Sequence, residues 1–411
     1  MRQLIHSLIP LFVSCFILLL GNGLINVLVP VSMNLQGIAP DTIGFVLSLY
    51  FVGLLIGALY SAKLVKRAGH IRMFAGCVAL AALCILACSF SSSTIVFAMM
   101  RVLLGFCNAC AFTAMESWLS GSSTSQTRGK VLAVYNAVVL AGLFGGQFFM
   151  NITTPSDPSL FVIAGMLFCG ALIPIVLSRH PGPVVSDTQI MNLKTVFNRS
   201  PLGLICCLVS GIIYSALFNL LPVFSQTYGI TQLSLSWYMG SAIFGAFVLQ
   251  FPIGYLSDRF DRRRVLFAML VVSALSDIAV VIFADNGFHI PMYIATAITA
   301  GIIACTYPLS ISETFDKLEG HEMVSAMGCL ILAFAIGGII GPYSTSLMMA
   351  WFHNDMLFYV IAVIQLLLAA FVVIRMTARS ALPIDEQEQF VMQGSVISNV
   401  SELDPRTPHH D

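Results

Sequence analysis

The sequence predicts an all-α, polytopic membrane protein whose twelve transmembrane helices form two pseudo-symmetric six-helix bundles. The 411 residues are 58% hydrophobic and only 9% charged, with a mean hydropathy of +0.92, so most helices have no polar face to offer water. The apolar residues form twelve runs long enough to cross a bilayer, which takes about 20 residues each. Short charged segments separate these runs, and one charged hairpin occurs twice.

The twelve runs fall into two groups of six, separated by a polar stretch. The first six cover residues 8–33, 43–62, 73–90, 95–118, 130–150 and 159–177, within an N-terminal bundle at 1–178. Residues 179–200 are polar and contain prolines, so we expect a cytoplasmic linker. The second six cover residues 201–226, 234–255, 265–284, 291–314, 323–349 and 356–375, within a C-terminal bundle at 201–376. Residues 377–411 are expected to be a disordered cytoplasmic tail.

The basic residues predict how the helices are oriented. When the N-terminus is placed in the cytoplasm, all of the 19 Lys and Arg residues except Arg101 fall in cytoplasmic segments. Lys and Arg concentrate in short cytoplasmic loops of membrane proteins, and a wrong number of spans would break this alternation. Both termini are therefore predicted to be cytoplasmic, in a multi-pass protein of the bacterial inner membrane.

An internal repeat relates the two halves of the chain. Pro30 and Pro222 end similar stretches of the first and seventh spans, 192 residues apart, and the glycine pairs at 145–146 and 337–338 keep this offset. A densely charged hairpin at residues 254–264 has a weaker copy at 62–72. Two parallel halves of six spans are typical of a two-bundle transporter.

The two basic hairpins and the six-plus-six spans resemble the major facilitator superfamily. Within it, residues 24–30, 48–72, 116–129, 210–222, 250–258 and 307–308 resemble the YcaD-like transporters. The resemblance covers nearly the whole chain up to about Arg375. It implies a secondary active transporter that moves a small solute by alternating access, with protons as the expected coupling ion.

In that superfamily the charged hairpins act as cytoplasmic latches. The resemblance assigns eight residues to the latch: Lys66, Arg67, Gly69, Arg72, Gly254, Asp258, Arg259 and Arg264. In the second half, Asp258 is expected at the start of the eleventh span near Met323, and Arg259 is expected beside Glu313. In the first half Lys66 replaces the usual Asp, which makes the contact with a helix amino end repulsive. There only a pair between Arg67 and Glu116 is expected. The alternative is that these charges merely fix the topology.

Polar residues inside the spans are the candidate solute contacts. A charged side chain within a span costs roughly 2.5 to 3.5 kcal/mol on insertion scales, so Arg101 should face a cavity or a partner. Because the superfamily lines its cavity with the first, fourth, seventh and tenth helices, the resemblance implies a cavity wall of seven residues. They are Asn22, Asn26, Arg101, Asn108, Tyr214, Asn219 and Tyr307. Hydrogen bonds between helices are the competing explanation, and Arg101 could instead reach the headgroups.

Four ionisable residues are candidates for proton coupling: Arg101, Glu116, Glu313 and Asp277. Arg101 matches the Arg-x-x-x-Gly motif that the superfamily links with proton coupling. Glu116 and Glu313 end the fourth and tenth spans, where the latches could occupy them entirely. Asp277 lies in the ninth span, where a structural or lipid-edge role is the alternative. Without coupling, the protein would be a facilitated-diffusion uniporter.

Other function classes find little support in the sequence. The histidines lie at membrane edges or in the tail, and catalytic or nucleotide-binding motifs are missing, so we expect no enzyme, metal or cofactor. The expected partners are a small-molecule solute, protons and the lipid bilayer, with no nucleic acid and with the protein as a monomer. A non-transporting membrane sensor on the same fold is the remaining alternative. These residues do not identify the solute or the direction of transport.

Overall fold

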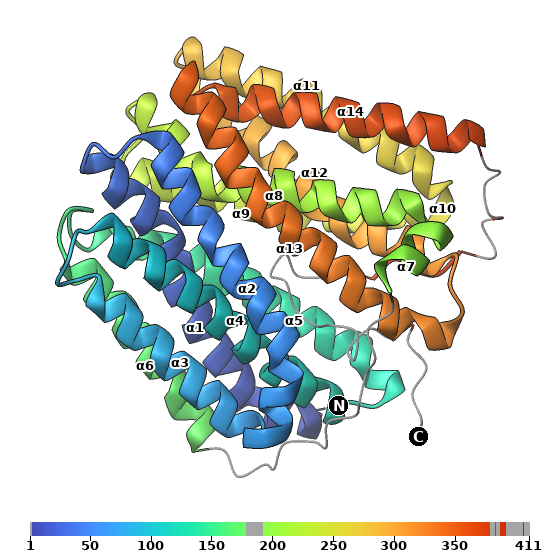
Figure 1. Cartoon of the computed structure of the whole chain (residues 1–411), viewed down its shortest axis with the longest axis horizontal. Coiled ribbons are helices and arrows are strands. Elements are labelled where there is room, and N and C mark those ends of the chain that lie inside the picture. The colour runs from blue at the N-terminus through green and yellow to red at the C-terminus, as the bar shows by residue number, and fades with distance from the viewer. Residues whose placement is uncertain (1, 178–191, 379–382, 384–386, 392–405, 407–411) are drawn as a thin grey trace. The chain divides into compact units, whose positions relative to one another are not determined.

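The computed structural model describes residues 2–177, 192–378, 383, 387–391 and 406. The chain forms two compact units, one made mainly by Met1–Thr188 and the other mainly by Gln189–Ile230 and Trp237–Met392. Within the described residues there is no strand, and twelve helices are long and apolar enough to cross a membrane. The predicted all-α, multi-pass fold is therefore confirmed (Figure 1).

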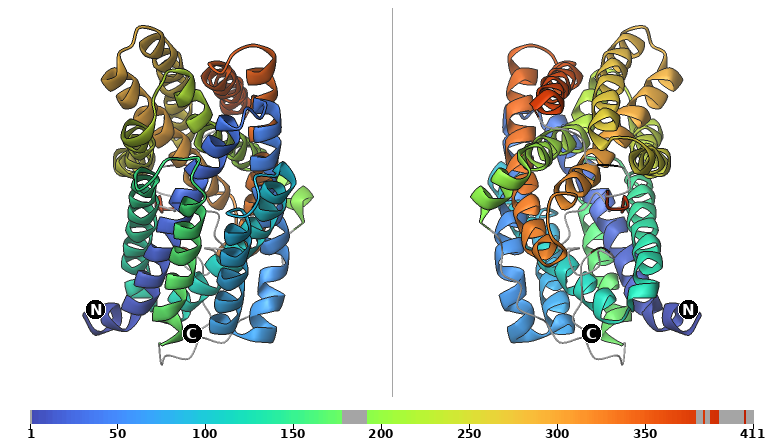
Figure 2. Two further views of the ribbon diagram at one scale, coloured as in Figure 1. Left: turned by 90° about the vertical axis from the view of Figure 1, so that its left-hand side faces the viewer. Right: turned by 90° about the vertical axis from the view of Figure 1, so that its right-hand side faces the viewer.

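Unit 1 consists of six long helices and one short one. They are α1 (Arg2–Leu35), α2 (Pro40–Ala68), α3 (His70–Ala87), α4 (Thr94–Gly121), α5 (Ser125–Gly146), the 3-10 helix η1 (Gln147–Asn151) and α6 (Ser159–Val176). α1 packs against α5 and α6, and α4 packs against α2 and α3 (Figure 2). The chain turns from α2 into α3 at Gly69, whose φ of +81° is a conformation that side chains disfavour.

Unit 2 repeats this plan. It contains α7 (Leu193–Arg199), α8 (Pro201–Thr227), α9 (Gln232–Val248, from Trp237 onward), α10 (Gln250–Arg259), α11 (Arg262–Asp285), α12 (His289–Phe315), α13 (Gly320–Trp351) and α14 (Met356–Ala378). The predicted eighth span is two helices, α9 and α10, separated by Leu249. The short helix α7 lies within the predicted linker, and residues 179–191 of that linker lie outside the described residues.

The helix pairs of unit 1 recur in unit 2. α1 packs against α5 and α6, and α8 packs against the corresponding α13 and α14. α3 packs against α4 and α6, just as α11 packs against α12 and α14. The pair formed by α2 and α4 has its counterpart in α10 and α12. The structure thus confirms the two pseudo-symmetric bundles.

Glycines allow the paired helices to approach each other closely. A Cβ atom on Gly53 would lie only 1.8 Å from the carbonyl oxygen of Val102, and one on Gly105 only 1.9 Å from that of Tyr50. The backbones of α2 and α4 are therefore in direct contact. On α13, a Cβ on Gly337 would lie 2.0 Å from a backbone oxygen of α8. Small residues at such contacts are how membrane helices associate where lipid removes the hydrophobic driving force.

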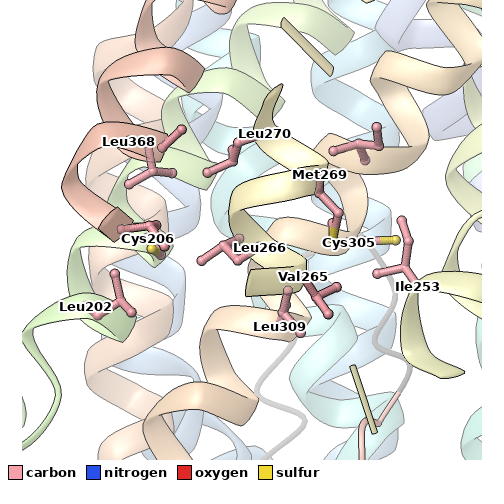
Figure 3. Close-up of a cluster of buried hydrophobic side chains, with 13 residues drawn as sticks. Leu202, Cys206, Ile253, Val265, Leu266, Met269, Leu270, Cys305, Leu309 and Leu368 are labelled. Atoms are coloured by element: carbon pink, nitrogen blue, oxygen red, sulfur yellow. The ribbon is translucent and has the colours of Figure 1, made fainter. Parts of the chain in front are cut away.

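Unit 2 has an apolar core where α8, α10, α11, α12 and α14 meet (Figure 3). Its buried side chains include Cys206, Ile253, Leu266, Leu270, Leu309 and Leu368. Because Ile253 belongs to α10 and Leu266 to α11, this core holds both sides of the charged hairpin in place.

Candidate functional site

Five polar side chains from α1, α2 and α4 meet inside unit 1, and we call them the Arg101 cluster: Asn22, Asn26, Tyr50, Arg101 and Asn108. The Asn108 amide donates to Asn22 Oδ1 at 2.6 Å and to the Tyr50 hydroxyl at 3.3 Å. The Arg101 Nη1 atom donates to Asn26 Oδ1 at 3.3 Å. These contacts join three helices through polar groups in an otherwise apolar bundle.

Helical spacing brings the cluster together. Asn22 and Asn26 lie one turn apart on α1, and Arg101 and Asn108 lie two turns apart on α4, so each pair shares a face. Gly105 lies between Arg101 and Asn108 and admits the α2 backbone at Tyr50. The same glycine therefore packs α2 against α4 and places the Tyr50 hydroxyl within reach of Asn108.

Arg101 is the least satisfied member of the cluster. Its side chain is fully buried, and its Nε and Nη2 atoms have no hydrogen-bond partner in the described parts of the chain. A guanidinium that reached the headgroups would be exposed, so the headgroup alternative does not fit this position. A buried guanidinium with free donors is costly, and an acceptor group that met these donors would lower that cost.

The predicted cavity residues of unit 2 form a different kind of cluster. Tyr214 and Tyr307 both lie against the ring of Phe334 on α13, with ring centroids 5.8 and 4.7 Å away. The Asn219 amide donates to the Ser215 carbonyl one turn earlier in its own helix, at 2.8 Å. Unit 2 thus offers aromatic surface where unit 1 offers polar groups and a cation.

The structure therefore brings four of the seven predicted cavity residues, Arg101 among them, into one cluster and places two more against Phe334. Sequence reasoning missed Tyr50 and Phe334. Tyr50 is a polar-tipped residue in an apolar run and lies on the helix face that meets Gly105, but nothing in its own run distinguishes it from a packing residue. The role of these residues in solute binding stays a prediction.

The two carboxylates that end α4 and α12 each have a local partner. Glu116 is buried and accepts a hydrogen bond from the Tyr135 hydroxyl at 2.9 Å. Glu313 forms an ion pair with Lys317, which lies one turn further along the chain. Each carboxylate thus already has a polar partner within its own unit.

Asp277 is a buried carboxylate of a different kind. It lies on α11 in unit 2 with none of its surface exposed, which excludes the predicted lipid-edge placement. Neither of its oxygens has a hydrogen-bond partner among the residues that the structure describes. The Thr299 hydroxyl on α12 lies near this carboxylate, although no hydrogen bond of normal geometry joins the two among the described residues. Gln365 on α14 donates a hydrogen bond of 2.9 Å to the hydroxyl of Ser273, one turn before Asp277. Asp277 is therefore held inside the bundle without an ion-pair partner among the described residues.

The charged hairpin of unit 2 makes other pairs than predicted. Arg259 lies over the ring of Tyr255 at 4.2 Å instead of beside Glu313. Asp258 Oδ1 lies 3.9 Å from Arg262 Nη2 and accepts a hydrogen bond from the Phe390 amide. Among the described residues, Asp258 does not make the expected contact with the start of α13. The reason is geometric: Arg259 ends α10 on an exposed face, whereas Arg262 begins α11, which packs against α12.

The buried ion pair of the hairpin joins Arg262 to Asp316. Arg262 Nη1 donates to Asp316 Oδ1 at 3.0 Å, and both side chains are almost fully buried. Burial raises the pKa of Asp316 to about 6, and the Arg262 guanidinium partly opposes this rise. Sequence reasoning named neither residue for the latch, although the Arg262 side chain is more buried than that of any predicted latch cation in this hairpin.

The remaining predicted latch residues occupy simpler environments. Lys66, Arg67 and Arg72 of the first hairpin are exposed, as is Arg264 of the second. The expected pair between Arg67 and Glu116 does not form, because Arg67 is exposed whereas Glu116 is buried against Tyr135. In the first hairpin a hydrogen bond of 3.0 Å between His70 and Ser117 joins the start of α3 to the end of α4.

Comparison with known proteins identifies relatives along nearly the whole chain. A sequence model described as Major Facilitator Superfamily matches residues 11–248 and 204–400. The uncharacterized MFS-type transporter YcaD of Salmonella arizonae is 28% identical over 365 residues, which cover 86% of this chain and 91% of the relative. An MFS-type transporter of Enterobacter sp. (strain 638) is 29% identical over 383 residues, covering 90% and 95%.

Two solved structures share the fold at low sequence identity. A bacterial homologue of the human lysosomal transporter Spinster, in an inward-facing conformation, matches with a TM-score of 0.75 at 13% identity, covering 94% of this chain and 98% of that one. The nucleoside transporter NupG matches with a TM-score of 0.71 at 13% identity, covering 90% and 98%. At this identity the likeness concerns the fold alone.

Replacing Arg262 with Met should destabilise the protein more as the pH rises. Asp316, with a pKa of about 6, is neutral below that pH and needs no cation, whereas above it the buried carboxylate depends on Arg262. Arg262 lowers the pKa of Asp316, so the loss of Arg262 costs more as pH rises through 6. We expect a loss of about 3 kcal/mol at pH 8 and a smaller loss at pH 5, measured by thermal unfolding in detergent.

Arg259→Met serves as the matched control for this measurement. Its guanidinium lies on the exposed side of the hairpin over Tyr255, so its removal should cost less than about 1 kcal/mol at both pH values. Equal losses for the two variants, or a loss for Arg262→Met that shrinks with rising pH, would contradict the assignment of the buried pair.

Proposed function

The chain belongs to the Major Facilitator Superfamily, and from that membership we propose that it is a secondary transporter that moves a small solute by alternating access, coupled to protons. Transporter relatives that match most of its length support the transport class. The observation that carries the proposal is that each unit contains a fully buried ionisable side chain that has unpartnered polar atoms and no ion pair within the described residues, Arg101 in unit 1 and Asp277 in unit 2.

Arg101 suggests the chemical class of the solute. Its free Nε and Nη2 donors suit the oxygens of a carboxylate or phosphate, which a guanidinium binds with two parallel hydrogen bonds. Asn22, Asn108 and Tyr50 add polar groups that are bonded to one another and so hold a fixed geometry. We propose that the solute is a small organic anion. Tyr214 and Tyr307 remain the candidate contacts of unit 2.

Asp277 is the proposed proton carrier. A charged carboxylate in an apolar interior without hydrogen bonds is strongly unfavourable, and uptake of a proton removes this cost. Glu116 and Glu313 differ from Asp277, because Tyr135 donates a hydrogen bond to Glu116 and Lys317 forms an ion pair with Glu313. Arg101 would then bind solute, and Asp277 would exchange protons as the protein changes conformation.

A ligand-stabilisation screen tests the proposed solute class. Purified protein is heated with members of a panel of monocarboxylates, dicarboxylates, sugar phosphates, nucleosides and neutral sugars. We expect anions to raise the melting temperature, and we expect Arg101→Gln to abolish the rise because its donors are lost. Asn108→Ala keeps the cation but loses its local hydrogen bonds, so it should lower the apparent affinity for the anion about tenfold. The melting temperature should then rise less at the same anion concentration. Arg264→Gln, an exposed cation, is the control. Stabilisation by neutral solutes that survives in Arg101→Gln would refute the anion assignment.

Uptake into proteoliposomes tests proton coupling, with the most stabilising anion of the screen as the solute. An imposed pH gradient should drive its accumulation by the wild-type protein. Asp277→Asn should lose this dependence, whereas Glu313→Gln should change the rate and keep it. Uptake at the same rate with and without the pH gradient would identify a uniporter. If the folded protein moved no solute at all, the proposal that it is a transporter would be contradicted.

A further inference from the structure

A short stretch of the C-terminal segment, Gln387–Val391, makes backbone hydrogen bonds to the charged hairpin region of unit 2. The Phe390 amide donates to Asp258 Oδ1 at 2.8 Å, and the Glu388 amide donates to Asp316 Oδ1 at 2.8 Å. Alternate amides of an extended chain point to the same side, which lets residues 388 and 390 reach both carboxylates. The predicted disordered tail began at residue 377, but Thr377 and Ala378 belong to the end of α14. The remainder of that tail lies outside the described residues, apart from Pro383 and Arg406.

The ring of Phe390 packs beside the apolar core of unit 2. It packs against the apolar cluster that contains Ile253 and Leu309. A Cβ atom on Gly254 would lie 2.6 Å from the Phe390 ring, so only the missing side chain of Gly254 leaves room for it against α10. Gly254 is the first residue of the charged hairpin, and this contact gives its small size a physical reason.

Arg406 fastens the same stretch to the end of α12. Its Nη1 atom donates to the buried hydroxyl of Ser312 at 2.9 Å and to the carbonyl of Gln389 at 3.3 Å. Its guanidinium also lies over the ring of Phe315, 4.7 Å from the centroid. The side chain thus bridges the tail stretch and the helix end.

We propose that Gly254, Asp258, Ser312, Phe315 and Asp316 form a peptide-binding surface, the tail site, whose occupant is residues 387–390 together with the Arg406 side chain of the same chain. Two carboxylates recognise two alternate backbone amides, and the glycine surface recognises one aromatic side chain. This combination of main-chain hydrogen bonds with a side-chain pocket is a recurring mode of peptide recognition. Acidic groups suit backbone amides here because charge-assisted hydrogen bonds are stronger than neutral ones.

Occupation of the tail site restrains the charged hairpin. Asp258 belongs to α10 and Asp316 follows α12, and Arg262 of α11 contacts both carboxylates at 3.9 and 3.0 Å. A docked tail therefore ties the hairpin to the end of α12, and it occupies Oδ1 of Asp258, a residue that the resemblance assigns to the latch. The tail acts as a removable clamp on the hairpin, a role that does not depend on which solute or ion the protein moves.

Hydrogen exchange of the full-length protein in detergent, followed by mass spectrometry, tests the tail site. In the wild-type protein, the amides within residues 387–391 should exchange about tenfold or more slowly than a free peptide of this sequence, because two of them donate to carboxylates. Phe390→Ala removes the ring, and Gly254→Val blocks its position. Both changes should bring exchange in 387–391 back to the free-peptide rate and should speed exchange in the hairpin at residues 260–264.

Gln389→Ala is the matched control, because its side chain is exposed and its carbonyl, which Arg406 contacts, is retained. This variant should exchange like the wild type. Asp258→Asn changes the tail site without adding bulk. It should reduce the protection of the Phe390 amide from hydrogen exchange, and this test remains available if Gly254→Val fails to fold. Free-peptide exchange in the wild-type protein, or protection that survives both Phe390→Ala and Asp258→Asn, would overturn the proposal.

Discussion

An ionisable side chain inside a membrane-spanning bundle must find partners or lose its charge, and this constraint decides where function is expected in this protein. Lipid supplies no polar groups, so each charge depends on what the neighbouring helices offer. Arg262 forms an ion pair with Asp316 and Glu313 forms one with Lys317, so each of these charges has an opposite charge beside it. Arg101 and Asp277 are not met in this way within the described residues. These two side chains are the ones for which we propose that a solute or a proton provides the missing partner.

The two units share their packing but differ in their chemistry. The same helix pairs occur in both, and glycines such as Gly105 and Gly337 let backbones touch in each. The polar groups inside the two units are not related by the repeat. Unit 1 contains the Arg101 cluster, whereas unit 2 contains aromatic rings around Phe334 and, separately, the buried Asp277. Packing is constrained at every helix contact, while a side chain that faces a polar interior can change without separating the helices. A duplicated fold can therefore divide solute binding and proton uptake between its halves.

Hydropathy and periodicity were sufficient to predict the spans, because each helix must bury an apolar surface of bilayer length regardless of its partners. Spacing along the helix is also enough to place Asn22 on one face with Asn26, and Arg101 with Asn108, because residues one or two turns apart share a face. Hydropathy and spacing could not predict Tyr50 in the cluster, which depends on how α2 meets Gly105. Arg262 rather than Arg259 is the buried cation because of how α11 packs against α12. The contact of Phe390 with the hairpin joins segments more than 100 residues apart. Contacts of these kinds are set by tertiary structure and leave no local pattern in the sequence.

Infrared difference spectroscopy of Asp277 tests most directly whether an unmatched buried carboxylate carries a proton. The spectrum of the purified wild-type protein at neutral pH is compared with that of Asp277→Asn, and Asp285→Asn, which changes an exposed carboxylate at the end of the same helix, serves as the control. A protonated Asp277 predicts that the wild type shows the carbonyl band of a neutral carboxylic acid, and that only Asp277→Asn loses it. If Asp277→Asn lost only bands of an ionised carboxylate and no carboxylic-acid band, Asp277 would be charged in the interior of unit 2. That result would contradict its proposed role in proton coupling.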